Sequence, residues 1–118
     1  MPVKRISIQS LNQLLNGETT ETATCMIKVY SNSCDMCHNL KEYYEDIAEK
    51  YNDIYFYAFN IGDDVDLEKR LGFKGVPTII KIQSTPPNSR VDILGEPHTP
   101  NKLTYYRSSD IKNFIEGT

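Results

Sequence analysis

The middle of the chain holds a long amphipathic segment between two apolar segments, and this pattern limits the possible folds more than any other feature. Residues 34–51 carry apolar side chains at steps of three and four positions, which predicts a helix with one buried face. Residues 24–30 before it and residues 54–61 after it are apolar on both faces, as in strands buried inside a sheet. This order of strand, helix and strand predicts an α/β fold.

Weaker signals place further elements on both sides of this unit. Ile6 and Ile8 predict a short edge strand, and Ser10 with Gln13 has the form of a capping box for a helix that ends at Gly17. The predicted order along the whole chain is βαβαβαββα, an α/β sandwich whose sheet begins parallel and ends antiparallel. The later elements are a short helix capped by Asp63 or Asp64, strands at 78–82 and 91–94 joined by a turn at 85–89, an extended segment at 103–106, and a last helix capped by Ser108 or Ser109.

Length and charge narrow the class of protein. A chain of 118 residues predicts a single domain, residues 1–118. With 13 basic and 16 acidic side chains the net charge is −3, and such a chain is not expected to bind nucleic acid, which needs a basic face. No apolar run approaches the roughly 20 residues of a membrane-spanning helix, and residues 1–8 lack the apolar region of a signal peptide. We therefore expect a cytoplasmic monomer that does not enter a membrane.

Two of the three cysteines lie together, at the junction between the first buried strand and the long helix. Cysteines three residues apart on a first helical turn, here Cys34 and Cys37, can close a small disulfide ring. The unpaired amides and the positive dipole end of the helix favour a thiolate at Cys34 and lower its pKa below the usual value. Cys37 lies one turn further in and is expected to be shielded. These residues predict thiol–disulfide exchange, in which Cys34 attacks a substrate disulfide and Cys37 resolves the mixed disulfide.

Two other kinds of site use cysteines in a similar pattern, but both fit this sequence less well. Cys34 and Cys37 followed by His38 match the attachment pattern of c-type haem, but that class needs export and an apolar haem pocket. A zinc site with His38 or His98 as a further ligand lacks the second spaced pair that structural zinc sites commonly use. We therefore expect no cofactor and no metal. Cys25 alternates with apolar residues and is expected to be a buried core thiol.

A proline at the start of a predicted buried strand is the second candidate element of the site. Gly75, Val76, Pro77 and Thr78 form this stretch, and a proline there cannot donate a hydrogen bond to the sheet. A cis bond before Pro77 would leave a backbone edge free beside Cys34 for an extended substrate. An ordinary trans proline at a loop–strand boundary explains the same residues, since only about 5–6% of such bonds are cis.

Taken together, these motifs resemble thioredoxin, most closely over residues 24–94. The resemblance implies a thioredoxin fold, with a central mixed sheet of four to five strands and about four flanking helices. It implies Cys34 as nucleophile, Cys37 as resolving thiol, Pro77 in cis, and Val76 and Gly95 in the substrate groove. It also implies electrons from thioredoxin reductase or another thiol donor. The residues that carry it are the Cys34-x-x-Cys37 unit between strand and helix, Asn60-Ile61, Leu71-Gly72-Phe73-Lys74-Gly75-Val76-Pro77-Thr78 and the terminal helix.

The chain departs from the family around the first cysteine. Ser33 stands where the family usually has tryptophan, so the edge of the groove is expected to be more polar. Asp35 and Met36 replace the usual glycine–proline spacer and are expected to contact substrate together with Ser33. The carboxylate of Asp35 opposes a thiolate at Cys34, which predicts a reducing couple rather than a strongly oxidising one.

A second departure lies behind the cysteines. Lys28 stands where the family keeps a buried carboxylate, and Ala58 stands where that carboxylate's lysine partner would be. One hypothesis is that burial depresses the pKa of Lys28, so that it stabilises or deprotonates Cys37. The other is that Lys28 extends to the sheet edge and takes no part in the chemistry.

Tyrosines supply most of the large rings, with eight tyrosines, four phenylalanines and no tryptophan. Tyr43, Tyr44 and Tyr51 follow the apolar stripe of the long helix and are expected to line the core. Tyr105 and Tyr106 are expected at the surface, as a possible partner patch.

The sequence thus predicts a protein-disulfide reductase that acts on disulfide-containing proteins. An adaptor or assembly subunit without turnover, with residues 95–101 as a docking insert, is the alternative from another class. A glutaredoxin-like, glutathione-dependent reductase is disfavoured because the glycine pair expected after the proline strand is missing.

Overall fold

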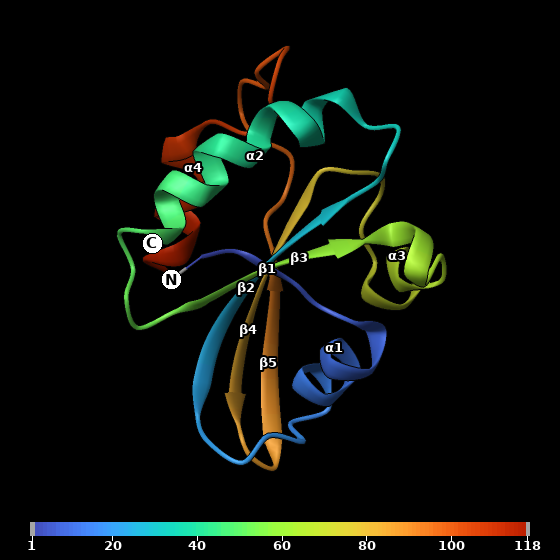
Figure 1. Cartoon of the computed structure of the whole chain (residues 1–118), viewed down its shortest axis with the longest axis vertical. Helices are drawn as coiled ribbons and strands as arrows, with labels where there is room; N and C mark the ends of the chain where they lie inside the picture. Colours follow the sequence, from blue (N-terminus) through green and yellow to red (C-terminus); the bar gives the residue numbers. More distant parts are fainter. Residues whose placement is uncertain (1, 118) are drawn as a thin grey trace.

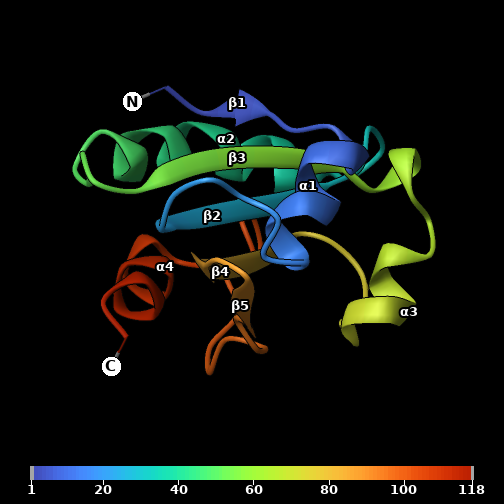
Figure 2. The ribbon, with the colours of Figure 1, turned by 90° about the horizontal axis from the view of Figure 1, so that it is seen from below.

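The computed structural model describes residues 2–117 and shows a five-stranded sheet in the order β1-β3-β2-β4-β5. β1, β3 and β2 are parallel, whereas β4 and β5 are antiparallel to their neighbours. The predicted parallel start and antiparallel end are therefore confirmed. Figure 2 shows these strands one below another in this order. The strands are β1 (Lys4–Arg5), β2 (Ala23–Tyr30), β3 (Tyr55–Asn60), β4 (Thr78–Thr85) and β5 (Asn88–Ile93).

Helices cover both faces of the sheet, as Figure 1 shows. α2 and α4 lie on one face, and α1 and α3 lie on the other. The mixed sheet between two helical layers confirms the expected α/β thioredoxin fold. The helices are α1 (Ile8–Leu15), α2 (Asp35–Ala48), the 3-10 turn η1 (Ile61–Asp63), α3 (Leu67–Leu71) and α4 (Ser108–Ile115).

The central strand β2 divides the core into two clusters because its side chains alternate between the two faces. Cys25, Ile27 and Val29 pack with α1 and α3. Met26 points to the other face and packs with α2 and α4. Lys28 shares that second face, so a basic residue is placed between the sheet and α2.

The N-terminal elements begin earlier than the sequence predicts. The edge strand is Lys4–Arg5. Ile6 follows the strand and is buried, and the Ile6 amide donates to Ala58 O at 3.0 Å. α1 is capped by Ser7, whose Oγ accepts from the Ser10 amide at 3.2 Å. Ser10, the predicted cap, lies inside the helix. Only Ser10 has the glutamine of a capping box three residues on, but Ser7 provides the cap through its own side-chain oxygen.

Two later boundaries also differ from prediction. Asp63 belongs to the 3-10 turn, and Asp64 lies before α3, where its side chain accepts from the Asp66 amide and pairs with Arg70 at 2.7 Å. The segment 103–106 is a compact loop rather than an extended strand. Asn101 and Tyr105 exchange both backbone hydrogen bonds, at 2.9 and 2.7 Å, around its turn.

The hairpin is found where it was predicted, although β4 and β5 both extend into the predicted turn at 85–89. β4 and β5 form a hairpin whose turn is Pro86-Pro87, with the bond between the two prolines in cis. The predicted cap of the last helix is wrong: α4 begins at Ser108, so its N-cap is Arg107 rather than Ser108 or Ser109, and the side chain of Asp110 accepts from the backbone amide of Arg107 at 2.9 Å. Among the described residues, no helix is long and apolar enough to span a membrane.

Candidate active site

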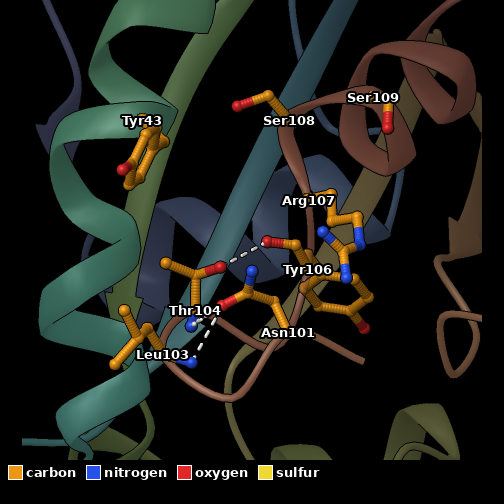
Figure 3. Close-up of a pocket in the computed structure, with 8 residues that line it drawn as sticks. All are labelled: Tyr43, Asn101, Leu103, Thr104, Tyr106, Arg107, Ser108 and Ser109. Carbon is orange, nitrogen blue, oxygen red and sulfur yellow. Dashed lines mark hydrogen bonds between the residues drawn. The ribbon is translucent and has the colours of Figure 1, made fainter. Parts of the chain in front are cut away.

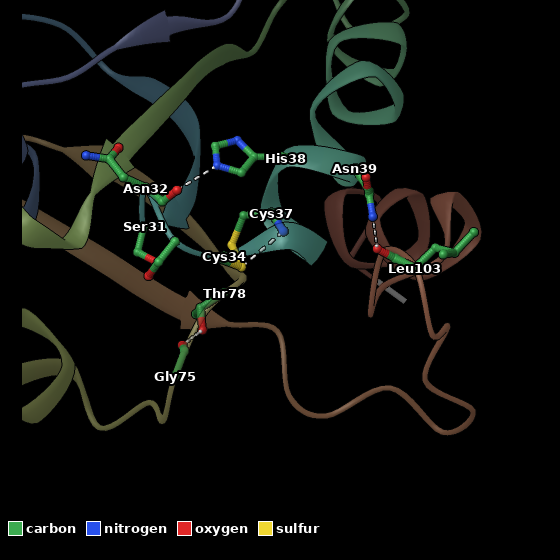
Figure 4. The surroundings of a disulfide bond; sticks show 10 residues. Ser31, Asn32, Cys34, Cys37, His38, Asn39, Gly75, Thr78 and Leu103 are labelled. Carbon is green, nitrogen blue, oxygen red and sulfur yellow. Dashed lines mark hydrogen bonds between the residues drawn. A yellow bond between two sulfur atoms is a disulfide. The ribbon is translucent and has the colours of Figure 1, made fainter.

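A disulfide joins Cys34 and Cys37 where β2 ends and α2 begins (Figure 4). Cys34 precedes the first residue of α2 and has extended backbone angles, as an N-cap does, and its Cα lies 5.3 Å from that of Cys37. The amide of Cys37 donates to Cys34 Sγ at 3.1 Å. The first turn of the helix therefore directs an N–H group at the sulfur that would carry negative charge after reduction.

The two sulfurs differ in their access to solvent. Cys34 is partly exposed, whereas Cys37 keeps 1% of its surface exposed beneath the helix. Ser33, Asp35 and Met36 are all exposed around Cys34. The structure thus brings the predicted contact residues to the accessible side of the disulfide.

The proline stretch lies at the same end of the sheet. β4 begins at Thr78, which pairs with Val29 near the end of β2, and Thr78 Oγ1 donates to Gly75 O at 2.8 Å. The bond between Val76 and Pro77 is cis, as the resemblance implied. Pro77 is buried and Val76 is half-buried. Figure 4 shows Gly75 and Thr78 beside Cys34.

Gly95 reaches this end of the sheet through β5. The amide of Leu94 donates to Ile79 O at 2.9 Å, so the chain still follows β4 just before Gly95. Gly95 itself is exposed. The structure therefore brings Cys34, Pro77 and Gly95, which are far apart in the sequence, to one edge of the molecule.

Lys28 is buried on the face of the sheet that α2 covers, with 5% of its surface exposed. Its Nζ lies 5.5 Å from the ring centre of Tyr44 and 5.9 Å from that of Tyr30. Burial lowers the pKa of Lys28 to about 8; nearby Glu45 raises the pKa and nearby Lys41 lowers it further. The predicted direction of this shift is confirmed, while a role in the chemistry stays a prediction.

Three polar residues hold the segment before Cys34, and sequence reasoning assigned them no such role. The carbonyl of Asn32 lies 3.0 Å from His38 Nε2, and its side-chain oxygen accepts from Asn60 Nδ2 at 3.0 Å. Asn60 Oδ1 in turn accepts from the Gly62 amide at 2.9 Å. The one available signal was the polar Asn60 at the end of an otherwise apolar strand.

The third cysteine lies on the opposite face of β2 from Lys28. Cys25 is buried in the cluster under α1 and α3, and burial raises its pKa to about 11. Its prediction as a core thiol is confirmed.

Within residues 2–117 no group of three His, Cys, Asp or Glu side chains is placed to hold a metal ion, so the structure offers no ligand set for the zinc interpretation.

The loop after Gly95 folds against α2 and is tied there by Asn39, whose Nδ2 donates to Leu103 O at 2.9 Å.

Tyr106 was expected at the surface, but it is buried, and its hydroxyl donates to Leu94 O at 3.1 Å. Tyr43 was expected in the core, but 53% of its surface is exposed. A cavity of about 380 Å³ lies between α2 and the loop after Gly95. Figure 3 shows residues of its wall. Its wall includes Tyr43, Asn101, Leu103, Thr104, Tyr106 and Arg107.

Solved structures with the same fold are numerous. Thioredoxin f from spinach chloroplast (short form) has a TM-score of 0.70 at 18% identity, over 98% of this chain and 91% of that one. The reduced Schistosoma mansoni thioredoxin pre-protein has a TM-score of 0.70 at 14% identity, over 98% and 97%. Malassezia sympodialis thioredoxin has a TM-score of 0.69 at 15% identity, over 97% and 88%.

Sequence comparison identifies the family. No curated protein sequence matches the chain. The thioredoxin family model matches residues 4–104, which contain the disulfide, the cis proline and all five strands. The chain belongs to the thioredoxin family.

Proposed function

We propose that the chain reduces protein disulfides by dithiol–disulfide exchange through Cys34 and Cys37. The observation that carries this proposal is the unequal access of the two sulfurs at the start of α2. A partly exposed Cys34 suits attack on an external disulfide, and a buried Cys37 suits the resolving step.

The exchange takes two steps. In the first, the thiolate of Cys34 attacks one sulfur of the substrate disulfide, the substrate S–S bond breaks, and one substrate sulfur leaves as a thiolate that takes up a proton. In the second, the thiolate of Cys37 attacks Cys34 Sγ, and the second substrate thiol leaves. The substrate gains two electrons and the Cys34–Cys37 disulfide forms. Thioredoxin reductase or another thiol donor would return the pair to the dithiol.

Two local charges act on Cys34 in opposite directions. The Cys37 amide and the helix N-terminus favour the thiolate, whereas the exposed carboxylate of neighbouring Asp35 disfavours it. Replacing Asp35 by Asn is therefore expected to speed attack at neutral pH and to make the reduction potential less negative. A variant with a more negative potential would contradict this part of the proposal.

We place the substrate across Ser33, Met36, Val76, Pro77 and Gly95. Pro77 lacks an amide N–H and lies just before β4, so it leaves part of the strand edge unpaired beside Cys34. An extended substrate segment with backbone groups opposite this edge would present its disulfide to Cys34 Sγ.

We further propose that the ammonium of Lys28 stabilises the thiolate of Cys37 in the resolving step. Lys28 lies on the face of β2 that α2 covers, and Lys41 and Glu45 next to it follow Cys37 by one and two turns of that helix. Replacing Lys28 by Met is expected to slow the resolving step and to change its pH profile. An unchanged rate across pH would leave Lys28 as a packing residue only.

The test is reduction of insulin-type disulfides, run with a thioredoxin reductase and separately with glutathione as donor. The Cys34→Ser variant is expected to lose turnover, and the Cys37→Ser variant to accumulate a mixed disulfide. The Cys25→Ala variant is the matched control and should retain turnover, because Cys25 is buried on the far side of the sheet.

The donor arms separate the alternatives. Turnover with glutathione alone would favour a glutaredoxin-like reductase. Absence of turnover with either donor, with partner binding retained in Cys34→Ser, would contradict the reductase and favour an adaptor that docks through the loop after Gly95. The cytoplasmic location and the monomeric state stay predictions from the sequence.

A further inference from the structure

A cavity of about 310 Å³ lies between β1 and α2, on the inner side of the disulfide. Cys37 forms part of its wall, although that side chain is hidden from the open surface. Its volume falls at the lower end of the range for small-molecule sites, about 300–1,000 Å³. Its wall includes Lys4, Arg5, Tyr30, Lys41, Glu45 and Ala58.

The wall is basic in a chain whose net charge is −3. Arg5 is already paired with Asp63 at 3.0 Å. Lys4 and Lys41 have no carboxylate within ion-pair distance among residues 2–117. Glu45 is the one acidic side chain of the wall, so the two unpaired lysines exceed the available negative charge.

A buried cation adds to this excess. Among residues 2–117 no carboxylate lies within ion-pair distance of Lys28 Nζ, and because no buried side-chain nitrogen there lacks a hydrogen-bond partner, the unpaired Nζ keeps contact with solvent while 5% of the residue's surface is exposed. Its closest charged neighbours, Glu45 and Lys41, belong to the wall, and so does Tyr30, against whose ring Nζ lies. Lys28 therefore adjoins the cavity without a counter-ion of its own.

The small side chain of Ala58 explains why the cavity has room for a counter-ion. It is the register partner of Lys28 on β3 and contributes a single methyl group to the wall. A longer side chain at this position would fill the space opposite the ammonium. The cavity therefore lies between the unpaired Lys4 and Lys41 of its rim and the unpaired Lys28 behind it.

We propose that this cavity binds one small oxyanion, a carboxylate or phosphate group carried by a small molecule, as the counter-ion of Lys28. Lys4 of β1 and Lys41 of α2 would donate charge-assisted hydrogen bonds to its oxygens from opposite walls. Lys28 would add attraction that water screens less than that of an exposed lysine, because most of its side chain is buried. Bound there, the anion lies next to the resolving cysteine.

Binding is tested on the oxidised protein, with its disulfide intact and with no turnover required. Inorganic phosphate and, in a second arm, acetate are titrated at pH 7 and constant ionic strength while backbone amide resonances are followed by NMR. Saturable shifts are expected in β1 and in the first half of α2. Tighter binding of phosphate than of acetate would identify a phosphate site, and tighter binding of acetate would identify a carboxylate site.

Variants decide whether the proposed residues hold the anion. Lys41→Gln and Lys28→Met are each expected to weaken binding at least tenfold, and Lys41→Gln keeps the test valid if the buried substitution perturbs folding. Lys74→Gln and Lys102→Gln remove exposed charges outside the cavity wall and should leave the affinity unchanged.

Three results would overturn the proposal: shifts that do not saturate, equal weakening by all four variants, or shifts confined to other surfaces. Each of them means that an adventitious ion only is bound. Because the assay uses no substrate, its failure would leave the proposed reductase activity intact, and a failed reductase assay would leave this site intact.

Discussion

Lys28 and Ala58 are direct register partners on the parallel strands β2 and β3, so a buried lysine stands beside a residue whose side chain is a single methyl group. Elsewhere in proteins a buried charge is usually paired or hydrogen-bonded. Here the two tyrosine rings beside Nζ supply the main favourable contact, and the helix above contributes both Glu45 and Lys41. Keeping Lys28 charged in the folded protein therefore lowers the free energy of unfolding.

That loss predicts a specific dependence of stability on pH. Burial lowers the pKa of Lys28 from 10.5 to about 8, so between these values the unfolded chain holds a proton that the folded chain has released. The free energy of unfolding therefore rises with pH across this window. At pH 7 the Lys28→Met variant should be the more stable protein, by on the order of 2 kcal/mol, with the gap closing toward pH 10.

Urea unfolding of both proteins at several pH values measures this gap. Cys25, whose pKa is raised to about 11, contributes the opposite slope above pH 9, but it does so in both proteins and cancels in the difference. A difference that stays constant from pH 7 to 10 would show that the ammonium is not destabilised by burial.

Two adjacent tyrosines of α2 should respond differently to loss of the hydroxyl. Tyr44 is fully buried and donates to Tyr57 O at 3.0 Å, whereas Tyr43 is exposed. Tyr44→Phe should lower the free energy of unfolding by about 1 kcal/mol, because one buried hydrogen bond is lost. Tyr43→Phe is the matched control and should change it by less than about 0.5 kcal/mol. Equal effects in thermal unfolding would contradict the assignment of core and surface.

A pair of glycines separates crowding from backbone strain. Gly17 and Gly72 both have positive φ, 69° and 80°. A Cβ on Gly17 would also lie within 2.8 Å of the Asn88 backbone and strike Pro87, while one on Gly72 would meet nothing within 4 Å. Gly72→Ala should therefore lose about 1 kcal/mol from strain alone. Gly17→Ala should lose clearly more, and similar losses in denaturant titrations would argue against the close approach of α1 to the β4–β5 turn.

The buried thiol gives a chemical test of the fold. In the oxidised protein Cys25 is the one free cysteine among the described residues and is buried beneath α1. An alkylating reagent should modify no thiol in the native protein and one thiol in denaturant. Modification of the native protein at the rate seen for an unfolded peptide would show that this side of the core opens easily.

The sequence predicted the βαβ unit and the position of the cysteine pair well because both depend on local patterns. The helix that begins after Cys34 has a regular apolar stripe, and the two cysteines mark its first turn. The alternation of Cys25 with apolar residues likewise placed it in the core. These features need no knowledge of distant contacts.

Other features escaped prediction because distant contacts decide them. Neighbouring residues on a helix point about 100° apart, so the stripe alone could not tell exposed Tyr43 from buried Tyr44. Tyr106 is buried because its hydroxyl reaches Leu94, a contact that closes a loop of irregular structure. The tie between Asn32 and Asn60 joins two strand ends and leaves no periodic signal.

The position of β2 between β3 and β4 has a consequence for any partner of this chain. Cys34 follows a strand that is hydrogen-bonded along both edges, so the reacting sulfur has little freedom to search for a disulfide. In the proposed exchange the partner would therefore have to bend or locally open to bring its own sulfur into line. The conformational entropy lost on forming the mixed disulfide is therefore lost mainly by the partner, which favours targets whose disulfides lie in mobile segments.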